Sequence, residues 1–163
     1  MIIYKINIIS FAGIKNKVIE FDEKINIIYG ENEKGKSSIE NFIRIFLYGL
    51  NSKRTKDIKE NDRLRFMPLD EEKIRGELYI SYENRKYIIK RTFGKTKKED
   101  SSEIIDAETG EEVKTIPKEE PGRYFLNVNS ATFNKTLFIR QLGVSITKDK
   151  EEEIIDKAAN LLD

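Results

Sequence analysis

The sequence of 163 residues contains neither cysteine nor histidine. Their absence excludes disulfides, thiolate nucleophiles, imidazole bases and Cys/His zinc sites from this chain, so any metal must bind to oxygen ligands. No run approaches the roughly 18 apolar residues of a membrane-spanning helix. The N-terminus also lacks the basic region and the small-residue cleavage site of a secretory signal. We therefore expect a soluble, cytoplasmic chain.

Composition favours one globular domain with unevenly placed charge. Hydrophobic residues make up 38% of the chain and charged residues 36%, and the net charge is only +1. This near-neutrality is a cancellation of separate blocks: residues 85–98 hold seven bases and no acid, whereas residues 99–120 hold nine acids and two bases. Net charge alone therefore does not exclude an anionic partner.

Three short segments near the N-terminus have the composition of β-strands. Residues 2–11 are rich in isoleucine, and residues 18–21 and 25–29 are further runs of β-forming residues. The run 25–29 is almost continuously apolar, which predicts a strand buried on both faces of a parallel or mixed sheet. From Lys36 the apolar residues recur at helical spacing, and Gly49 is placed to end the helix.

The middle of the chain predicts antiparallel hairpins after a polar connection. Residues 51–73 are polar, and we expect no regular structure there. Residues 77–82 and 86–93 alternate around a polar tripeptide and predict a β-hairpin. A second hairpin is expected around residues 106–112, where Gly110 supplies a turn position that tolerates positive φ.

The C-terminal part is predicted to be helical. After Pro121 the apolar residues are spaced as in helices that break at residues 127–130. Residues 154–162 carry an apolar stripe at helical spacing, which suits either a helix that closes the core or the start of a coiled-coil arm. We favour the arm, because the pattern reaches the last residue. The expected organisation is therefore a lobe over residues 1–147 and an arm that starts in residues 148–163.

A phosphate-binding loop lies between the apolar segment 25–29 and the predicted helix. Residues 30–37 match the pattern G-x-x-x-x-G-K-[ST] in the strand–loop–helix context that the motif requires. Its glycines let backbone N–H groups surround a polyphosphate, and the helix adds the positive end of its dipole. The motif predicts a nucleoside triphosphate with Mg²⁺ bound by Gly30, Glu31, Asn32, Glu33, Lys34, Gly35, Lys36, Ser37 and Ser38.

The loop assigns a role to each of three side chains. Lys36 would reach the β- and γ-phosphates, the Ser37 hydroxyl would coordinate Mg²⁺, and Ser38 would lie near the α-phosphate. Hydrolysis also needs a carboxylate for the metal at the end of an apolar strand. No stretch of four apolar residues followed by Asp or Glu exists in this sequence, so the hydrolytic site is incomplete.

The chain resembles a known group of ATPases over nearly its whole length. The resemblance starts at residues 10–13, continues through the strand-like runs into the G-x-N-E-x-G-K-S loop, and resumes at residues 132–141. These segments are similar to the ABC-type ATPase heads of structural-maintenance-of-chromosomes, SbcC and RecF-like proteins, closest to the YhaN-like AAA-family branch.

The resemblance implies an α/β P-loop fold and a head assembled from two parts. The chain would be the N-terminal lobe, with a mixed sheet, antiparallel hairpins and a coiled-coil helix. A C-terminal half would bring the signature motif, the Walker B acid and the catalytic glutamate. Two heads would then sandwich two ATP molecules. Gln141 matches the family's Q-loop position, which implies a role at Mg²⁺ and the attacking water, and Arg54 is the nearest match to an arginine that reaches nucleotide or DNA.

The basic stretch leaves two interpretations open. Tyr87 and Phe93 alternate with its bases, which suits a track for nucleic-acid phosphates. It also suits a solvated hairpin edge protected by lysines. The candidate nucleic-acid contacts are Arg85, Lys86, Lys90, Arg91, Lys95, Lys97 and Lys98.

Three functions follow as hypotheses. The first is the ATP- and Mg²⁺-binding half of a DNA repair or chromosome-maintenance ATPase, which hydrolyses ATP, with Lys36 and Gln141 in catalysis, only after completion by its other half and head dimerisation. The second is a self-contained small P-loop kinase, which requires an acid and a lid within these residues. The third is a nucleic-acid module whose loop only senses nucleotide.

Overall fold

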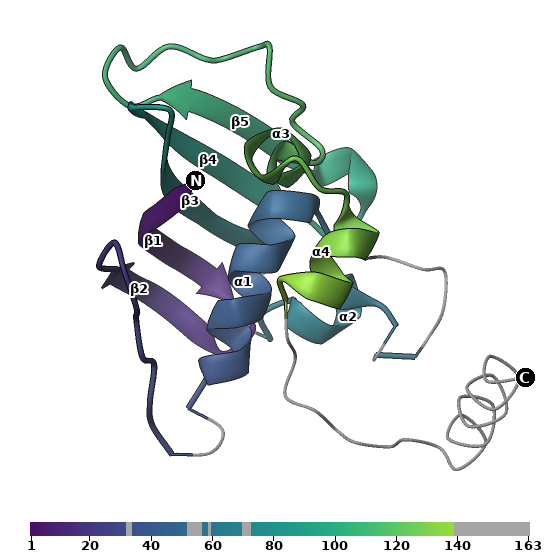
Figure 1. The fold of residues 1–163 in the computed structure, drawn as a ribbon. Coiled ribbons are helices and arrows are strands. Elements are labelled where there is room, and N and C mark those ends of the chain that lie inside the picture. The colour runs from purple at the N-terminus through teal and green to yellow at the C-terminus, as the bar shows by residue number, and fades with distance from the viewer. Residues whose placement is uncertain (32–33, 52–56, 59, 70–72, 139–163) are drawn as a thin grey trace, which may run out of the picture.

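One antiparallel sheet forms the framework of the computed structural model, which describes residues 1–31, 34–51, 57–58, 60–69 and 73–138. Its strand order is β2-β1-β3-β4-β5, and each neighbouring pair is antiparallel (Figure 1). The strands are β1 (Ile2–Phe11), β2 (Ile14–Glu20), β3 (Ile74–Tyr82), β4 (Arg85–Phe93) and β5 (Ser101–Asp106). β3 therefore joins the N-terminal hairpin to the strands that follow it.

The hairpin of β3 and β4 is the most regular pair. Its register runs unbroken from Ile74 opposite Phe93 to Tyr82 opposite Arg85. The two turn residues, Glu83 and Asn84, have φ values of 48° and 61°. Two successive positive φ angles are those of a type I′ turn, whose twist matches that of the strands. The predicted hairpin is confirmed.

Two other strand predictions are confirmed in part. β2 begins earlier than expected, at Ile14, and ends at Glu20. The predicted second hairpin is short: beyond β5 it consists of a bridge between Ile105 and Glu112 and a hydrogen bond from Val113 N to Ile104 O of 2.7 Å. Gly110 occupies the expected positive-φ position, with φ 74°.

The longest described helix, α1 (Lys36–Tyr48), lies across one face of the sheet, as Figure 1 shows. It ends where predicted, because Gly49 has φ 80° and donates its N–H to Ile45 O at 2.7 Å. α3 (Pro121–Leu126) and α4 (Ser130–Thr136) lie beside it, separated at Asn127 in the left-handed region, so the predicted break is confirmed. A 3₁₀ turn, η1 (Lys97–Glu99), precedes β5.

The connection between α1 and β3 contains a helix that was not predicted. α2 (Asp62–Phe66) lies inside the polar stretch 51–73. The Asn61 side chain accepts from the backbone N–H groups of Arg63 and Leu64, which caps the helix. The Arg63 guanidinium then pairs with Asp100, with Nη2 2.7 Å from Oδ2, and so holds α2 against the chain after β4.

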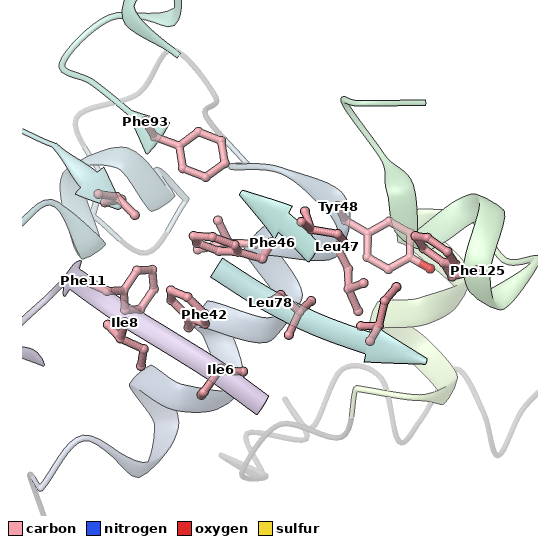
Figure 2. Close-up of a cluster of buried hydrophobic side chains, with 14 of the residues drawn as sticks. Ile6, Ile8, Phe11, Phe42, Phe46, Leu47, Tyr48, Leu78, Phe93 and Phe125 are labelled. Carbon is pink, nitrogen blue, oxygen red and sulfur yellow. The ribbon is translucent and has the colours of Figure 1, made fainter. Parts of the chain in front are cut away.

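Aromatic residues of α1 fill the space between helix and sheet (Figure 2). The rings of Phe42 and Phe46 stack at 4.0 Å between centroids, and Phe11 of β1 meets Phe42 edge-on at 5.5 Å. Phe66 of α2 stacks on Phe11 at 4.9 Å. Each fully buried side chain of this kind contributes about 1.5–3 kcal/mol relative to an exposed one, so this cluster holds α1 against the sheet.

Candidate nucleotide-binding site

The phosphate loop ends at the N-terminus of α1. Gly35 is the N-cap residue, with φ 85°, a conformation that strains any residue with a Cβ. No side chain caps this helix, and its first turn contains no acidic residue. The first backbone N–H groups of a helix have no acceptor within the helix, and its N-terminus is electropositive. The loop therefore presents N–H donors and positive charge to an anion.

Lys36 lies back over the loop that precedes it. Its Nζ donates to Gly30 O at 2.5 Å and to Glu31 O at 2.7 Å. The ammonium therefore binds carbonyl groups at the start of the loop, and these contacts can be exchanged for phosphate oxygens. Lys34, by contrast, is exposed and forms an ion pair of 3.8 Å with Glu31.

The donors of the loop fit a nucleotide phosphate chain and Mg²⁺. Ser37 is exposed in the first turn of α1, and Ser38 follows it half-buried. A hydroxyl is the kind of oxygen ligand that Mg²⁺ accepts when phosphates and water supply the others. In the described part of the chain no group of three acidic side chains could hold a metal by itself. The loop therefore suits a metal that arrives with a phosphate chain. Asn32 and Glu33 lie outside the described residues.

The apolar segment before the loop is not the buried strand that the sequence predicted. Residues 25–29 form no strand, and their side chains are open to solvent: Ile25 is 84%, Ile27 81% and Tyr29 90% exposed. The physical reason is pairing, because a strand exists only beside another strand, and none of the described residues pairs with this segment. A large apolar surface therefore leads directly into the phosphate loop.

Arg91 leaves the predicted nucleic-acid patch. It is 4% exposed, and its guanidinium donates to Ile45 O at 2.9 Å, to Glu119 O at 2.6 Å and to the Ser102 hydroxyl at 3.0 Å. It also contacts the carbonyl of Lys118. Burial lowers the pKa of Arg91 to about 10, against the opposing effect of nearby acids. A guanidinium held in this way joins α1 to the chain before α3 and is not available to a polyanion.

The remaining bases of residues 85–98 do not form one surface. Arg85 and Lys86 are exposed near the β3–β4 turn, and Lys95, Lys97 and Lys98 are exposed around η1. Lys90 lies on the sheet face away from α1 and pairs with Glu77 at 3.4 Å. The stretch is therefore two exposed basic groups rather than one continuous track. Gln141 and Arg54, the other predicted contacts, lie outside the described residues, as does the predicted arm of residues 148–163.

A buried polar cluster between α1 and the start of α2 was not predicted. Arg44 of α1 is 3% exposed, and its Nη2 donates to Asp62 Oδ2 at 2.8 Å. The sequence analysis assigned Arg44 no role, because no local pattern places an acid opposite it. One feature of the sequence could have indicated α2. Asparagine is a preferred N-cap residue, so Asn61 marks a possible helix start at Asp62.

The fold and the loop define the class of protein: a P-loop nucleotide-binding domain whose first helix packs on an antiparallel sheet. Comparison with protein families gives the particular group. The family described as "AAA domain" matches residues 5–163, and the chain belongs to that family.

Curated relatives agree with this assignment. The chain is similar to proteins named DNA double-strand break repair Rad50 ATPase, with 32% identity over 171 residues in Thermoplasma volcanium, covering 99% of this chain and 18% of the relative. In Thermoplasma acidophilum the identity is 30% over 142 residues, covering 87% and 15%. In Sulfolobus acidocaldarius it is 33% over 101 residues, covering 61% and 11%. The chain thus spans less than a fifth of the length of these relatives.

These matches confirm the resemblance to the heads of SMC-like and Rad50-like ABC ATPases. The closer resemblance to the YhaN-like branch stays a prediction. None of the helices in the described part of the chain has the length and apolar composition of a membrane span.

Proposed function

We propose that this chain is the nucleotide-binding N-terminal lobe of a Rad50-like ATPase and that it binds ATP with Mg²⁺. The observation that carries the proposal is the loop itself: an uncapped helix N-terminus at Gly35 with the Lys36 ammonium beside it. The names of the relatives, all ATPases, support ATP as the nucleotide.

In this proposal the loop binds and orients the phosphate chain. Backbone N–H groups from the loop and the first turn of α1 hold the phosphates, and Lys36 exchanges its carbonyl contacts for the β- and γ-phosphates. Ser37 would hold Mg²⁺, which would supply charge neutralisation at the phosphates. Ser38 would lie near the α-phosphate, and Gln141 would contact the metal and the attacking water.

Hydrolysis then requires residues from elsewhere. The sequence has no stretch of four apolar residues followed by Asp or Glu, and residues 25–29 expose an apolar surface that leads into the loop. We propose that a C-terminal half of the same head adds strands to residues 25–29 and brings the missing Walker B acid. Two completed heads would enclose two ATP molecules, each signature serine acting on the nucleotide of the other head.

The relatives' names also support a role for the full protein in DNA double-strand break repair. For this chain we propose that the exposed bases Arg85, Lys86, Lys95, Lys97 and Lys98 contribute to DNA binding. Bases that neutralise DNA phosphates release bound counterions, so the affinity for DNA falls as the salt concentration rises. Alanine at Lys97 and Lys98 should therefore weaken DNA binding and lower its salt dependence. Unchanged salt dependence would remove these two bases from the proposed surface.

The test measures ATP binding and phosphate release together. We expect the chain to bind Mg²⁺ and ATP, and Lys36→Ala to lose this binding. Lys34→Ala removes only an exposed side chain paired with Glu31 and keeps the backbone N–H of the loop, so it should retain binding. Phosphate release should begin only when a C-terminal half is added. Phosphate release or transfer by the chain alone would instead support a small kinase. Salt-dependent DNA binding with no ATP binding would support the nucleic-acid module.

A further inference from the structure

A chain of three polar contacts links α2 to the residue that the proposed function assigns to Mg²⁺. The first link is the buried pair of Arg44 and Asp62, with Nη2 and Oδ2 2.8 Å apart. In the second, Arg44 Nε donates to Asn41 Oδ1 at 3.2 Å. In the third, Asn41 Nδ2 donates to Ser37 O at 2.8 Å. All three links lie along the side of α1 that faces α2.

The far end of this chain is firmly held. Asp62 Oδ2 also accepts from Asn51 N at 2.8 Å, and Asp62 N donates to Asn51 O at 2.9 Å. Asp62 therefore ties the start of α2 to the chain that leaves α1. Because both ends are anchored, the Arg44 guanidinium has a defined position relative to the first turn of α1.

The same guanidinium contacts the chain that leads to Gln141. Its central carbon lies 6.0 Å from the centroid of the Phe138 ring, and Phe138 stacks on Phe133 of α4 at 5.9 Å. Phe138 is three residues before Gln141 in the sequence. One buried cation therefore contacts the helix that carries Ser37 and the segment that precedes the other proposed metal contact.

Stability alone does not account for such a group. A buried ion pair contributes little net stability compared with apolar residues of similar size, because both charges must leave water. α1 already has an apolar core on its other side, formed by Phe42 and Phe46. A buried polar relay that ends at a metal-binding residue instead resembles the outer contacts that orient metal ligands.

We propose that Arg44 is a positioning residue for Mg²⁺ with its nucleotide. Held by Asp62 and acting through Asn41, it fixes the carbonyl of Ser37 and so the setting of the Ser37 hydroxyl in the first turn of α1. This inference rests on the proposed function, because it needs ATP to bind at the loop.

The experiment measures ATP affinity twice, with Mg²⁺ and with a chelator, for the unaltered chain and for Asn41→Ala, Arg44→Lys and Asp62→Asn. Outer contacts of metal ligands are typically worth about 10–100-fold in metal affinity. The Mg²⁺ gain is the ratio of the ATP affinity measured with Mg²⁺ to the affinity measured in chelator. We expect each variant to have a Mg²⁺ gain about tenfold smaller than that of the unaltered chain, while its affinity in chelator stays within about twofold. Asn41→Ala removes the second and third links and leaves the buried ion pair of Arg44 and Asp62 intact.

Arg63→Lys is the matched control. Its guanidinium forms a comparable, partly buried pair with Asp100 at 2.7 Å, on the connection between α2 and η1. It should lower stability without changing the Mg²⁺ gain. Equal losses with and without Mg²⁺, or the same loss of the gain in Arg63→Lys, would overturn the inference. If the unaltered chain shows no Lys36-dependent ATP binding, the proposed function itself fails, and the inference fails with it.

Discussion

The guanidinium of Arg91 caps the C-terminal end of α1 by donating to the carbonyl oxygen of Ile45 at 2.9 Å. Ile45 O also accepts from Gly49 N, and the same guanidinium nitrogen reaches Phe46 O at 3.4 Å. The last carbonyls of a helix carry its negative end, so a buried cation there is favourable. The same side chain reaches the carbonyls of Lys118 and Glu119, ahead of α3. Through its side chain, Arg91 of β4 therefore holds the end of α1 and the residues before α3 together.

Replacing the Arg91 side chain should lower the stability of the fold. Arg91→Met keeps the aliphatic stem but removes the charged donor from the carbonyls of Phe46 and Glu119, whereas Ile45 O and Lys118 O each keep one other donor. Hydrogen bonds to charged groups are worth about 1.5–3 kcal/mol each. We expect the free energy of unfolding to fall by about 3 kcal/mol or more in urea titrations. Arg85→Met, at the exposed end of the same strand, should change it by no more than about 0.5 kcal/mol. A small effect at Arg91 would show that water replaces its contacts.

Close packing between β3 and α1 predicts a second sensitive position. A Cβ at Gly76 would lie 2.6 Å from Asn7 O and 2.7 Å from Phe42 Cζ. Both neighbours are held, one in β1 and one in the core, so Gly76→Ala should lower the free energy of unfolding by about 1–3 kcal/mol. Gly13→Ala meets nothing within 4 Å and is the control. Thermal unfolding of the two variants measures the difference, and equal midpoints would contradict the packing argument.

Local patterns predicted β1, the β3–β4 hairpin and α1. The strands among them pair with neighbouring strands of the described chain, and α1 packs on the core that they form. The alternation of β4 also contained information that its charge concealed. Arg91 shares the inward-facing positions of Tyr87, Ile89 and Phe93, so the two-residue period alone placed it inside. The prediction that Arg91 contacts nucleic acid was wrong, because it rested on the number of bases in residues 85–98 and not on the face of the strand that each base occupies.

Residues 25–29 and Arg44 were not predictable from the sequence for a different reason. The apolar content of residues 25–29 indicates a strand, but no local pattern says where its neighbours come from. Arg44 is paired with Asp62 eighteen positions away, across a connection whose path the sequence does not specify. In both cases the missing information was the identity of a distant partner.

Alkaline pH should destabilise the fold through Tyr48. Burial, together with the negative charge of Glu120, raises its pKa to about 12, and the phenol donates to Val128 O at 3.0 Å. From about pH 10 the unfolded chain releases this proton while the folded chain keeps it, so the free energy of unfolding falls as pH rises. Tyr79, with a pKa also raised to about 12, acts in the same direction.

Denaturant titrations from neutral pH to pH 11 test this dependence. Tyr48→Phe should flatten the fall in the free energy of unfolding above pH 10 without abolishing it, because Tyr79 remains. Tyr29→Phe, whose ring is 90% exposed, should leave the slope unchanged. An identical slope in Tyr48→Phe and the unaltered chain would show that this phenol ionises alike in both states.

The β3–β4 turn offers a stabilising substitution. Glu83 has φ 48°, a left-handed conformation that costs most L-residues about 1–2 kcal/mol but that asparagine adopts more readily. Glu83→Asn should therefore raise the free energy of unfolding by about 0.5–1 kcal/mol, with the gain seen as a higher thermal midpoint. Glu108→Asn, outside any positive-φ position, is the control. A lower midpoint for Glu83→Asn would mean that the Glu83 side chain stabilises the turn more than its backbone strains it.

Residues 25–29 allow the proposed completion of the head to be tested apart from folding. Ile27 is 81% exposed, so Ile27→Asp should change the free energy of unfolding of the chain alone by no more than about 0.5 kcal/mol and leave ATP binding intact. In a completed head the same residue would lie in a strand between two others, where a carboxylate would be buried without a partner. Ile27→Asp should therefore abolish the phosphate release that the C-terminal half induces. Leu69→Asp, which replaces a fully exposed leucine three residues after α2, should preserve it. Phosphate release that survives Ile27→Asp would contradict strand addition at this segment, whereas loss of stability in the isolated chain would show that residues 25–29 already pack within it.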